Sequence, residues 1–268
     1  MVPAPLTQTG TKRAEFRFYA ELNDFLPPRH RFVTNVRRFD GEASVKDLIE
    51  AAGIPHTEVD LVIVNSEPVD FTYRVRDGDR IAVYPMFEAL DIGPIAKVRP
   101  EPLREPRFAA DGHLGRLARH LRLLGFDTAY QRHWHDADLA ATAAAEGRIV
   151  LTRDSGLLKR NAVTHGMFVR AQQSRAQLLE IVGRLQLVSR FRPFTRCLEC
   201  NGPLIAVSRD EVADQVPERA WHFHEQFVRC VQCMRVYWPG THHERLRRLV
   251  EDIQFALRNS AEVDQCNS

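Results

Sequence analysis

The sequence predicts a mixed α/β fold in three parts, and three observations carry this prediction. Two strands, one helix and two more strands are expected within 14–87, short apolar strands alternate with helices over 107–190, and two Cys-x-x-Cys pairs follow. Alternation of strands and helices favours a mostly parallel sheet with helices on both faces. The 268 residues are 44% hydrophobic and 27% charged. This composition excludes collagen-like and largely disordered classes.

The first part has the element order of a β-grasp domain. Phe16 and Phe18 alternate with polar residues, as in a half-buried strand. Ser44 and Asp47 have the spacing of a capping box, and Gly53 before a proline ends the helix that this box begins. The expected elements are strands at 15–22, 31–39, 61–65 and 81–85 and a helix at 45–52.

The stretch VDLVIVNSEPVDFTYRVRDGDRIAVYP resembles the ubiquitin-like sulfur-carrier family. That family ends in a Gly-Gly tail that it activates as a thiocarboxylate, whereas this chain continues with MFEALDIGPIAK. We therefore expect a structural role, with a protein partner docking on the β-grasp domain, in place of carrier chemistry. A Pro-rich and charged linker is predicted over 88–106, extended and semi-rigid.

The second part, 107–190, alternates strands and helices. Strands are expected at 107–111, 127–130, 148–152 and 167–171, and helices at 112–124, 136–147 and 174–187. A cysteine-rich module with a C-terminal helix follows over 191–258, and a disordered tail is predicted over 259–268.

Three aspartates are expected near the same edge of the predicted parallel sheet. Asp111 and Asp154 each follow a predicted strand, and Asp136 heads the helix between them. The carboxyl ends of parallel strands surround the ligand crevice of such sheets. Carboxylates that converge there repel one another unless a cation binds, and oxygen ligands suit Mg²⁺ or Mn²⁺. Taken singly, each aspartate is equally typical of a turn or a helix cap. Asp138, in the first turn of the same helix, is the alternative or fourth acid.

A basic helix lies beside these acids. Arg116, Arg119 and Arg122 recur every three residues without an intervening acid, and Arg153 and Lys159 flank Asp154. We expect the three helical arginines on one polar face, where they would contact RNA phosphates. A solvated helix face is the alternative. The charge division agrees with the first interpretation, because residues 1–97 carry 12 basic against 15 acidic residues and residues 98–268 carry 25 against 20.

Four of the five cysteines form two pairs with metal-ligand spacing. Each Cys-x-x-Cys directs two thiolates at one ion, and two pairs complete a tetrahedral site without an open position, typical of structural zinc. A redox pair, or a histidine among His222, His224 and His242 in place of one cysteine, is the alternative. The expected ligands are Cys197, Cys200, Cys230 and Cys233, with Cys266 spare.

No secretory signal and no apolar stretch of membrane-spanning length is recognisable, so we expect a cytoplasmic location and no membrane partner. The aromatic residues between and beside the cysteine pairs are expected in the core of the module, with one or two touching RNA bases. These residues are Trp221, Phe223, Phe227, Tyr237 and Trp238.

Four stretches of the second and third parts resemble the mut-seven carboxy-terminal RNase domain family over 107–250. They read DGHLGRLARHLRLLGFDT, EGRIVLTRDSGLL, RCLECNGPL and RCVQCMRVYWPGTHHERL. This family has a PIN-like, three-layer α/β/α nuclease domain with an appended zinc ribbon, and members also carry an N-terminal ubiquitin-like domain. The resemblance implies a metal-dependent ribonuclease acting on tRNA or another structured RNA, with the acidic cluster at Asp111, Asp136 and Asp154 and Thr152 as polar partner. The alternative is a non-catalytic RNA- or ribosome-associated module that binds through the zinc ribbon and the basic helix.

Overall fold

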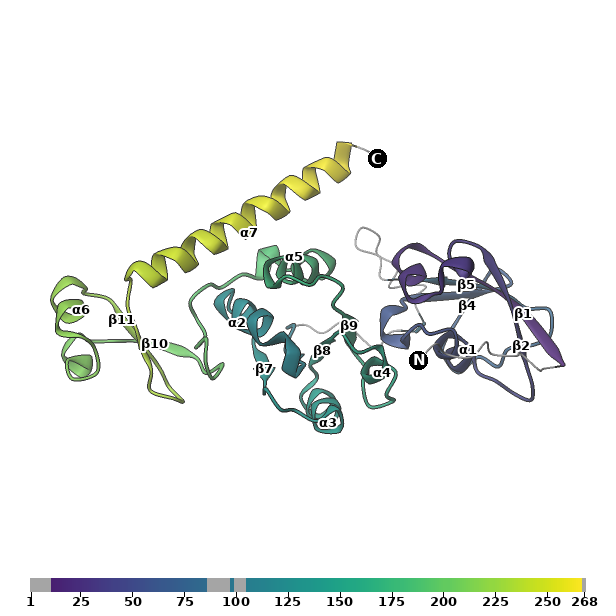
Figure 1. Ribbon diagram of the computed structural model, residues 1–268, viewed down its shortest axis with the longest axis horizontal. Helices are drawn as coiled ribbons and strands as arrows, with labels where there is room; N and C mark the ends of the chain where they lie inside the picture. Colours follow the sequence, from purple (N-terminus) through teal and green to yellow (C-terminus); the bar gives the residue numbers. More distant parts are fainter. Residues whose placement is uncertain (1–10, 86–96, 99–104, 267–268) are drawn as a thin grey trace. The chain divides into compact units, whose positions relative to one another are not determined.

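The computed structural model describes residues 11–85, 97–98 and 105–266, with side chains through Leu257 (Figure 1). Within these ranges the chain divides into two compact units. The first contains the N-terminal residues through Arg104 together with Thr152–Phe168, and the second contains Glu105–Leu151 and Val169–Ser268. The predicted linker over 88–106 falls almost entirely outside the described residues.

Strands and helices follow one another along the chain in the order of their numbers within each class. The strands are β1 Lys12–Phe18, β2 Thr34–Phe39, β3 Leu61–Val64, β4 Glu67–Val69, β5 Arg80–Tyr84, β6 Phe108–Ala110, β7 Thr128–Tyr130, β8 Ile149–Thr152, β9 Gly166–Phe168, β10 Leu204–Val207, β11 Phe227–Cys230 and β12 Val236–Tyr237. The α-helices are α1 Val45–Ala51, α2 Gly115–Leu123, α3 Asp136–Glu146, α4 Ser155–Leu158, α5 Ser174–Arg184, α6 Glu218–Phe223 and α7 Thr241–Cys266. None of the helices within the described ranges combines the length and the apolar character needed to cross a membrane.

The N-terminal sheet confirms the predicted β-grasp order. Its strands lie in the order β2-β1-β5-β3-β4, with β1 parallel to β5 and the other neighbours antiparallel. Phe16 and Phe18 are fully buried against α1, as their alternation predicts. The capping box is present: the Ser44 hydroxyl accepts a hydrogen bond from the Asp47 N–H, and the Asp47 carboxylate accepts one from the Ser44 N–H.

The segment Thr152–Phe168 packs with this β-grasp domain. The Phe168 N–H donates to Glu58 Oε1 at 2.6 Å, and the Phe168 ring meets the Phe25 ring edge-on. The imidazole of His56 bridges Glu50 and the Val163 carbonyl, at 2.7 and 3.0 Å. The stretch that follows β8, which belongs by sequence pattern to the second domain, is thus held by the first.

The second sheet is parallel at its centre, as predicted. Its strand order is β7-β6-β8-β9, and β6 pairs in parallel with both β7 and β8. All three residues of β6 are buried, because this central strand is covered on both faces. Helix α2 packs with α5 on one side of these strands and α3 lies on the other (Figure 1).

The C-terminal module is a three-stranded antiparallel sheet, β10-β11-β12, with a small core of its own. Val212, Val216 and Phe227 are buried there, and Trp221 and Trp238 pack against them. Phe223 departs from the expected core role, since it is 74% exposed. The last helix also departs from expectation, because α7 continues to Cys266 where the sequence predicts a disordered tail.

Candidate functional site

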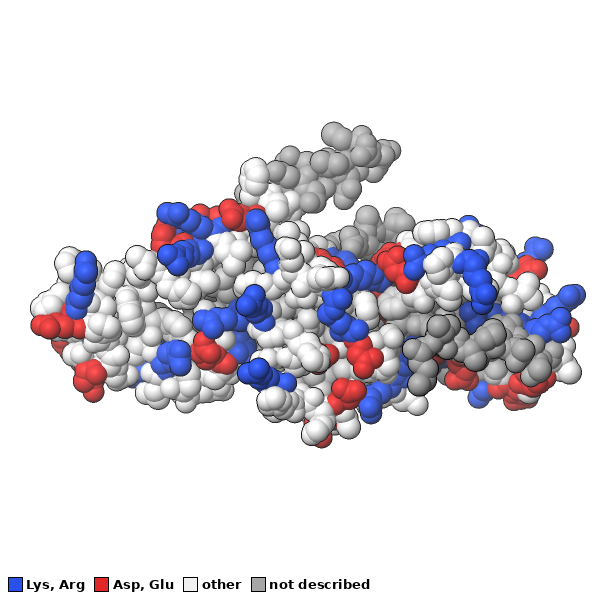
Figure 2. All heavy atoms as spheres, in the orientation of Figure 1, with Lys and Arg blue, Asp and Glu red and all other residues white. Residues whose placement is uncertain are grey.

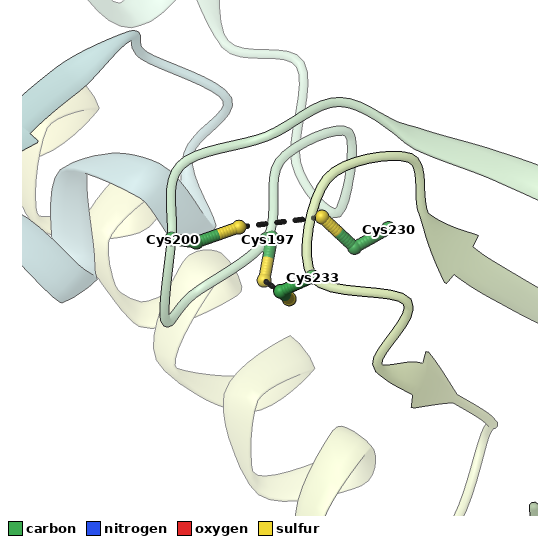
Figure 3. A group of neighbouring side chains, drawn as sticks. All are labelled: Cys197, Cys200, Cys230 and Cys233. Atoms are coloured by element: carbon green, nitrogen blue, oxygen red, sulfur yellow. Dashed lines mark hydrogen bonds between the residues drawn. The ribbon is translucent and has the colours of Figure 1, made fainter.

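The four cysteines of the C-terminal module meet in one group. Their Sγ atoms all lie within 4.8 Å of one another, with Cys197 3.6 Å from Cys233 and Cys200 3.3 Å from Cys230 (Figure 3). Tetrahedral coordination with Zn–S bonds of about 2.3 Å requires sulfur separations of about 3.8 Å, so the donor set fits a metal ion such as zinc. No other group of three or more candidate ligands in the described ranges is as closely placed.

Two turns of the same kind deliver these thiols. In the first, the Cys197 carbonyl accepts from the N–H of Asn201, and in the second the Cys230 carbonyl accepts from the N–H of Met234. The residue after the second cysteine has a positive φ in both, 72° at Asn201 and 61° at Met234. The shared geometry explains why both pairs have Cys-x-x-Cys spacing and aim at one point.

The thiols differ in their readiness to ionise. Burial opposes ionisation of Cys197, but hydrogen bonds from the backbone of Cys200 and the hydroxyl of Tyr237 outweigh it and lower the pKa to about 7. Burial raises the pKa of Cys200 to about 12. A second thiolate beside the first is costly without a cation, and a divalent ion removes that cost.

Asp111 lies immediately beyond the central strand of the parallel sheet. Its N–H donates to the Leu151 carbonyl of β8 at 3.0 Å, which continues the β6–β8 pairing in which Ala110 faces Leu151. Asp111 is also the N-cap residue of a short 3-10 helix, Gly112–Leu114. A Cβ at Gly112 would lie 2.5 Å from the Arg132 carbonyl oxygen, so only glycine permits this close approach. The expected place at the carboxyl end of a parallel strand is confirmed for Asp111.

Asp154 is fixed by two local hydrogen bonds. Its N–H donates to the hydroxyl of the fully buried Thr152 at 3.0 Å, and its Oδ1 accepts from the Gly156 N–H at 2.7 Å as the N-cap of α4. The side chain is exposed. Thr152 therefore holds the backbone of Asp154 directly, as the Thr-x-Asp pattern implies.

Asp136 and Asp138 are both exposed in the first turn of α3, where His135 is the N-cap residue. Asp136 is thus the first helical residue and not the cap. Acidic residues in a first helical turn are stabilised by the helix dipole.

The prediction of three exposed arginines on α2 is wrong for Arg122. Arg116 and Arg119 are exposed, but Arg122 is only 4% exposed and donates to the carbonyls of Leu198 and Glu199 in the first cysteine turn. A spacing of three falls short of the 3.6-residue turn, so successive arginines rotate by about 60° around the helix. Arg122 therefore reaches the border of the leucine stripe.

Arg153 is exposed beside Asp154. The ammonium group of Lys159, by contrast, donates to the Glu50 carbonyl of the β-grasp domain at 3.0 Å. Burial lowers the pKa of Lys159. Figure 2 shows Lys and Arg interspersed with Asp and Glu over the face drawn, so net charge alone does not mark an RNA surface.

A polar network joins the cysteine module to the parallel sheet, and sequence reasoning missed it. The Asp127 carboxylate accepts hydrogen bonds from Arg148 Nη1 and Asn201 Nδ2, both at 2.7 Å. Asn201 in turn accepts from the Thr128 N–H at the start of β7. The sequence places Asp127 at the edge of a predicted strand. Its partner Asn201 is 74 positions away, so no local pattern indicates the contact.

Two family models match the chain in sequence order. The Mut7-C ubiquitin model matches residues 11–91, and the Mut7-C RNAse domain model matches residues 106–250, more than half of the chain. No curated protein matches. No solved structure matches either. The domain that matches residues 106–250 indicates a nuclease-type function, and the four-cysteine group can bind a metal ion such as zinc. The chain therefore belongs to the Mut7-C RNAse domain family, with a Mut7-C ubiquitin domain preceding the RNase domain.

Proposed function

We propose that the protein is a metal-dependent ribonuclease that hydrolyses RNA phosphodiester bonds at the carboxyl ends of β6 and β8. The observation that carries the proposal is the pairing of these parallel strands, with Ala110 opposite Leu151, because Asp111 is the first residue after β6 and Asp154 the second after β8. Membership of the RNase domain family supports the same assignment.

The chain's own groups would divide the work as follows. Asp111, Asp154 and either Asp136 or Asp138 would hold Mg²⁺ or Mn²⁺, which supplies an activated water and stabilises developing negative charge when bound. The Gly156 N–H donates a hydrogen bond to Oδ1 of Asp154, so Oδ2 is the oxygen that would bind the metal ion. Arg116, exposed on α2, would steer the phosphate.

The ion in the cysteine group would be zinc with a structural role. Four thiolates complete a tetrahedral shell and leave no position for water or substrate. Its effect would be to fix the two cysteine turns against α2, where Arg122 already binds the carbonyls of Leu198 and Glu199. The zinc site would hold the C-terminal module in place, and the acids would carry the chemistry.

The test is cleavage of labelled RNA by the full chain with Mn²⁺ or Mg²⁺. Wild type should cleave, and Asp154→Asn and Asp111→Asn should each lower the rate by about a hundredfold or more, as expected when a charge-stabilising group is removed. Asp210→Asn, at an exposed position of the C-terminal module, is the matched control and should leave the rate unchanged.

Circular dichroism and zinc content should be equal in all four proteins. Cleavage by Asp154→Asn at the wild-type rate would overturn the assignment of that residue. RNA binding that is independent of divalent metal, with no product from any RNA offered, would favour a non-catalytic RNA-binding module.

A further inference from the structure

A pocket of about 510 Å³ opens between the cysteine turns, the start of α7 and helix α2, all within the second compact unit. None of the proposed catalytic acids, Asp111, Asp136, Asp138 and Asp154, lines it. Its walls combine aromatic rings with basic side chains, and Glu199 is its one acidic lining residue among the described residues.

The aromatic wall is built from both sides of the pocket. The Phe194 and His243 rings lie against each other, with centroids 4.3 Å apart and planes 31° apart. The Tyr237 hydroxyl is 3.1 Å from Cys197 Sγ, which fixes its ring next to the metal-binding group. Trp238 packs on the core of the module with its indole edge beside Gly240, where a Cβ would lie 3.2 Å away. These flat surfaces are held in place before any ligand arrives.

Three arginines form the charged part of the pocket. Arg119 pairs with Glu199 at 2.9 Å, and Arg196 binds the Asn201 carbonyl at 3.0 Å. Arg235 is exposed and makes no ion pair with any described residue. Arg196 also lies 3.5 Å from Asp127, so Arg119 and Arg196 each face a carboxylate, and Arg235 is the group with most freedom to take up an anion.

Flat aromatic surfaces beside guanidinium groups match the two halves of a nucleotide. Unpaired bases stack on aromatic rings with little regard to sequence, and arginine binds phosphate. We propose that this pocket binds a nucleotide of a single-stranded RNA segment, with the base against the Tyr237 and Trp238 wall and a phosphate at Arg235. The proposal rests on the proposed ribonuclease function for the identity of the nucleic acid, and it adds a substrate-binding site outside the acidic cluster.

The chain order explains why the pocket belongs with the metal-binding group. Leu198 and Glu199 lie between the first two cysteines, and Arg235, Val236 and Tyr237 begin two residues after Cys233. Fixing the cysteine turns therefore fixes one whole side of the pocket. A structural zinc would thus organise an RNA-binding surface without touching RNA itself.

The test uses the zinc-loaded full chain carrying Asp154→Asn, without added divalent metal, so that binding is measured apart from cleavage. Fluorescence anisotropy follows a labelled 12-nucleotide oligouridylate. Arg235→Ala should weaken binding about fivefold and reduce the slope of log affinity against log salt by about 0.7, the value for one lost phosphate contact with a single strand. The control is Arg219→Ala, which removes the same charge from an exposed position of the same module outside the pocket. It should change neither quantity.

A second readout locates the base. An oligouridylate containing 4-thiouridine should photo-crosslink to Phe194, Tyr237, Trp238 or His243 when mapped by mass spectrometry. Equal effects of Arg235→Ala and Arg219→Ala, crosslinks confined to other surfaces, or uridine monophosphate competing as well as the oligonucleotide would each overturn the proposal. Pocket crosslinks in a chain whose wild type cleaves no RNA would overturn the ribonuclease assignment and leave the binding site standing.

Discussion

At the scale of single residues, Asp127 connects the two halves of the second unit. It accepts hydrogen bonds from Arg148 next to β8 and from Asn201 in the first cysteine turn, and Arg196 lies 3.5 Å from its second oxygen. Burial opposes ionisation of this carboxyl, but the hydrogen bonds from Arg148 and Asn201 outweigh it and lower the pKa of Asp127 below its usual value of 3.8. The carboxylate form is therefore part of the folded structure.

Asp127→Asn should destabilise the protein by about 1–3 kcal/mol, because it removes the charge that faces Arg148 and puts an amide donor where Oδ2 faces Arg196. Urea unfolding measures the change, with the exposed Asp214→Asn as control. A folded pKa below the unfolded one means that the stabilisation is complete above about pH 4 and is lost as the pH falls through the folded pKa. The wild type should therefore lose stability in acid more steeply than Asp127→Asn. Parallel pH profiles for the two proteins would contradict this role.

Several residue roles were predictable from local pattern alone. The capping box at Ser44 and Asp47, the alternation of Phe16 and Phe18, and the Thr-x-Asp geometry at Thr152 all depend on partners a few positions away. The burial of Arg122 against Leu198 and the bond between Asp127 and Asn201 depend on residues more than seventy positions distant. Sequence patterns predict contacts between residues a few positions apart, but they do not predict contacts between distant residues.

At the scale of elements, the β-grasp domain holds the segment that carries Asp154. His56 is 8% exposed, and both of its ring nitrogens face acceptors, Glu50 Oε1 and the Val163 carbonyl. Lys159 and Phe168 make further hydrogen bonds to Glu50 and Glu58. The ubiquitin-like domain thus supplies partners for polar groups after β8 that this segment does not satisfy itself.

His56→Ala should make the amides of 156–168 exchange about tenfold faster with solvent, which corresponds to about 1.4 kcal/mol of opening free energy, or one net buried hydrogen bond. Hydrogen–deuterium exchange with mass spectrometry measures this directly. His30→Ala, which alters a β-grasp histidine outside these contacts, should leave the segment unchanged. Equal exchange in wild type and His56→Ala would show that the domain does not hold the segment.

At the scale of the whole molecule, the chain combines a ubiquitin-like domain, a parallel α/β sheet and a cysteine module that the family models match in the same order. Element order and cysteine spacing predicted this architecture, since strand–helix alternation and paired cysteines are local signals. The attachment of residues 152–168 to the first unit was not predictable, because nothing in that stretch reveals which domain supplies its hydrogen-bond partners. The pocket beside α7 was not predictable either, because its lining residues are spread along the sequence from Arg119 to Leu246.

The central claim is that a divalent ion binds where β6 and β8 end. The most direct measurement is a crystal structure of the zinc-loaded full chain grown with Mn²⁺, with anomalous diffraction recorded at the manganese edge. We expect an anomalous peak between the carboxylates of Asp111 and Asp154, lost in Asp111→Asn crystals grown under the same conditions. Manganese bound only at other sites, with the two carboxylates pointing apart in the wild type, would contradict it.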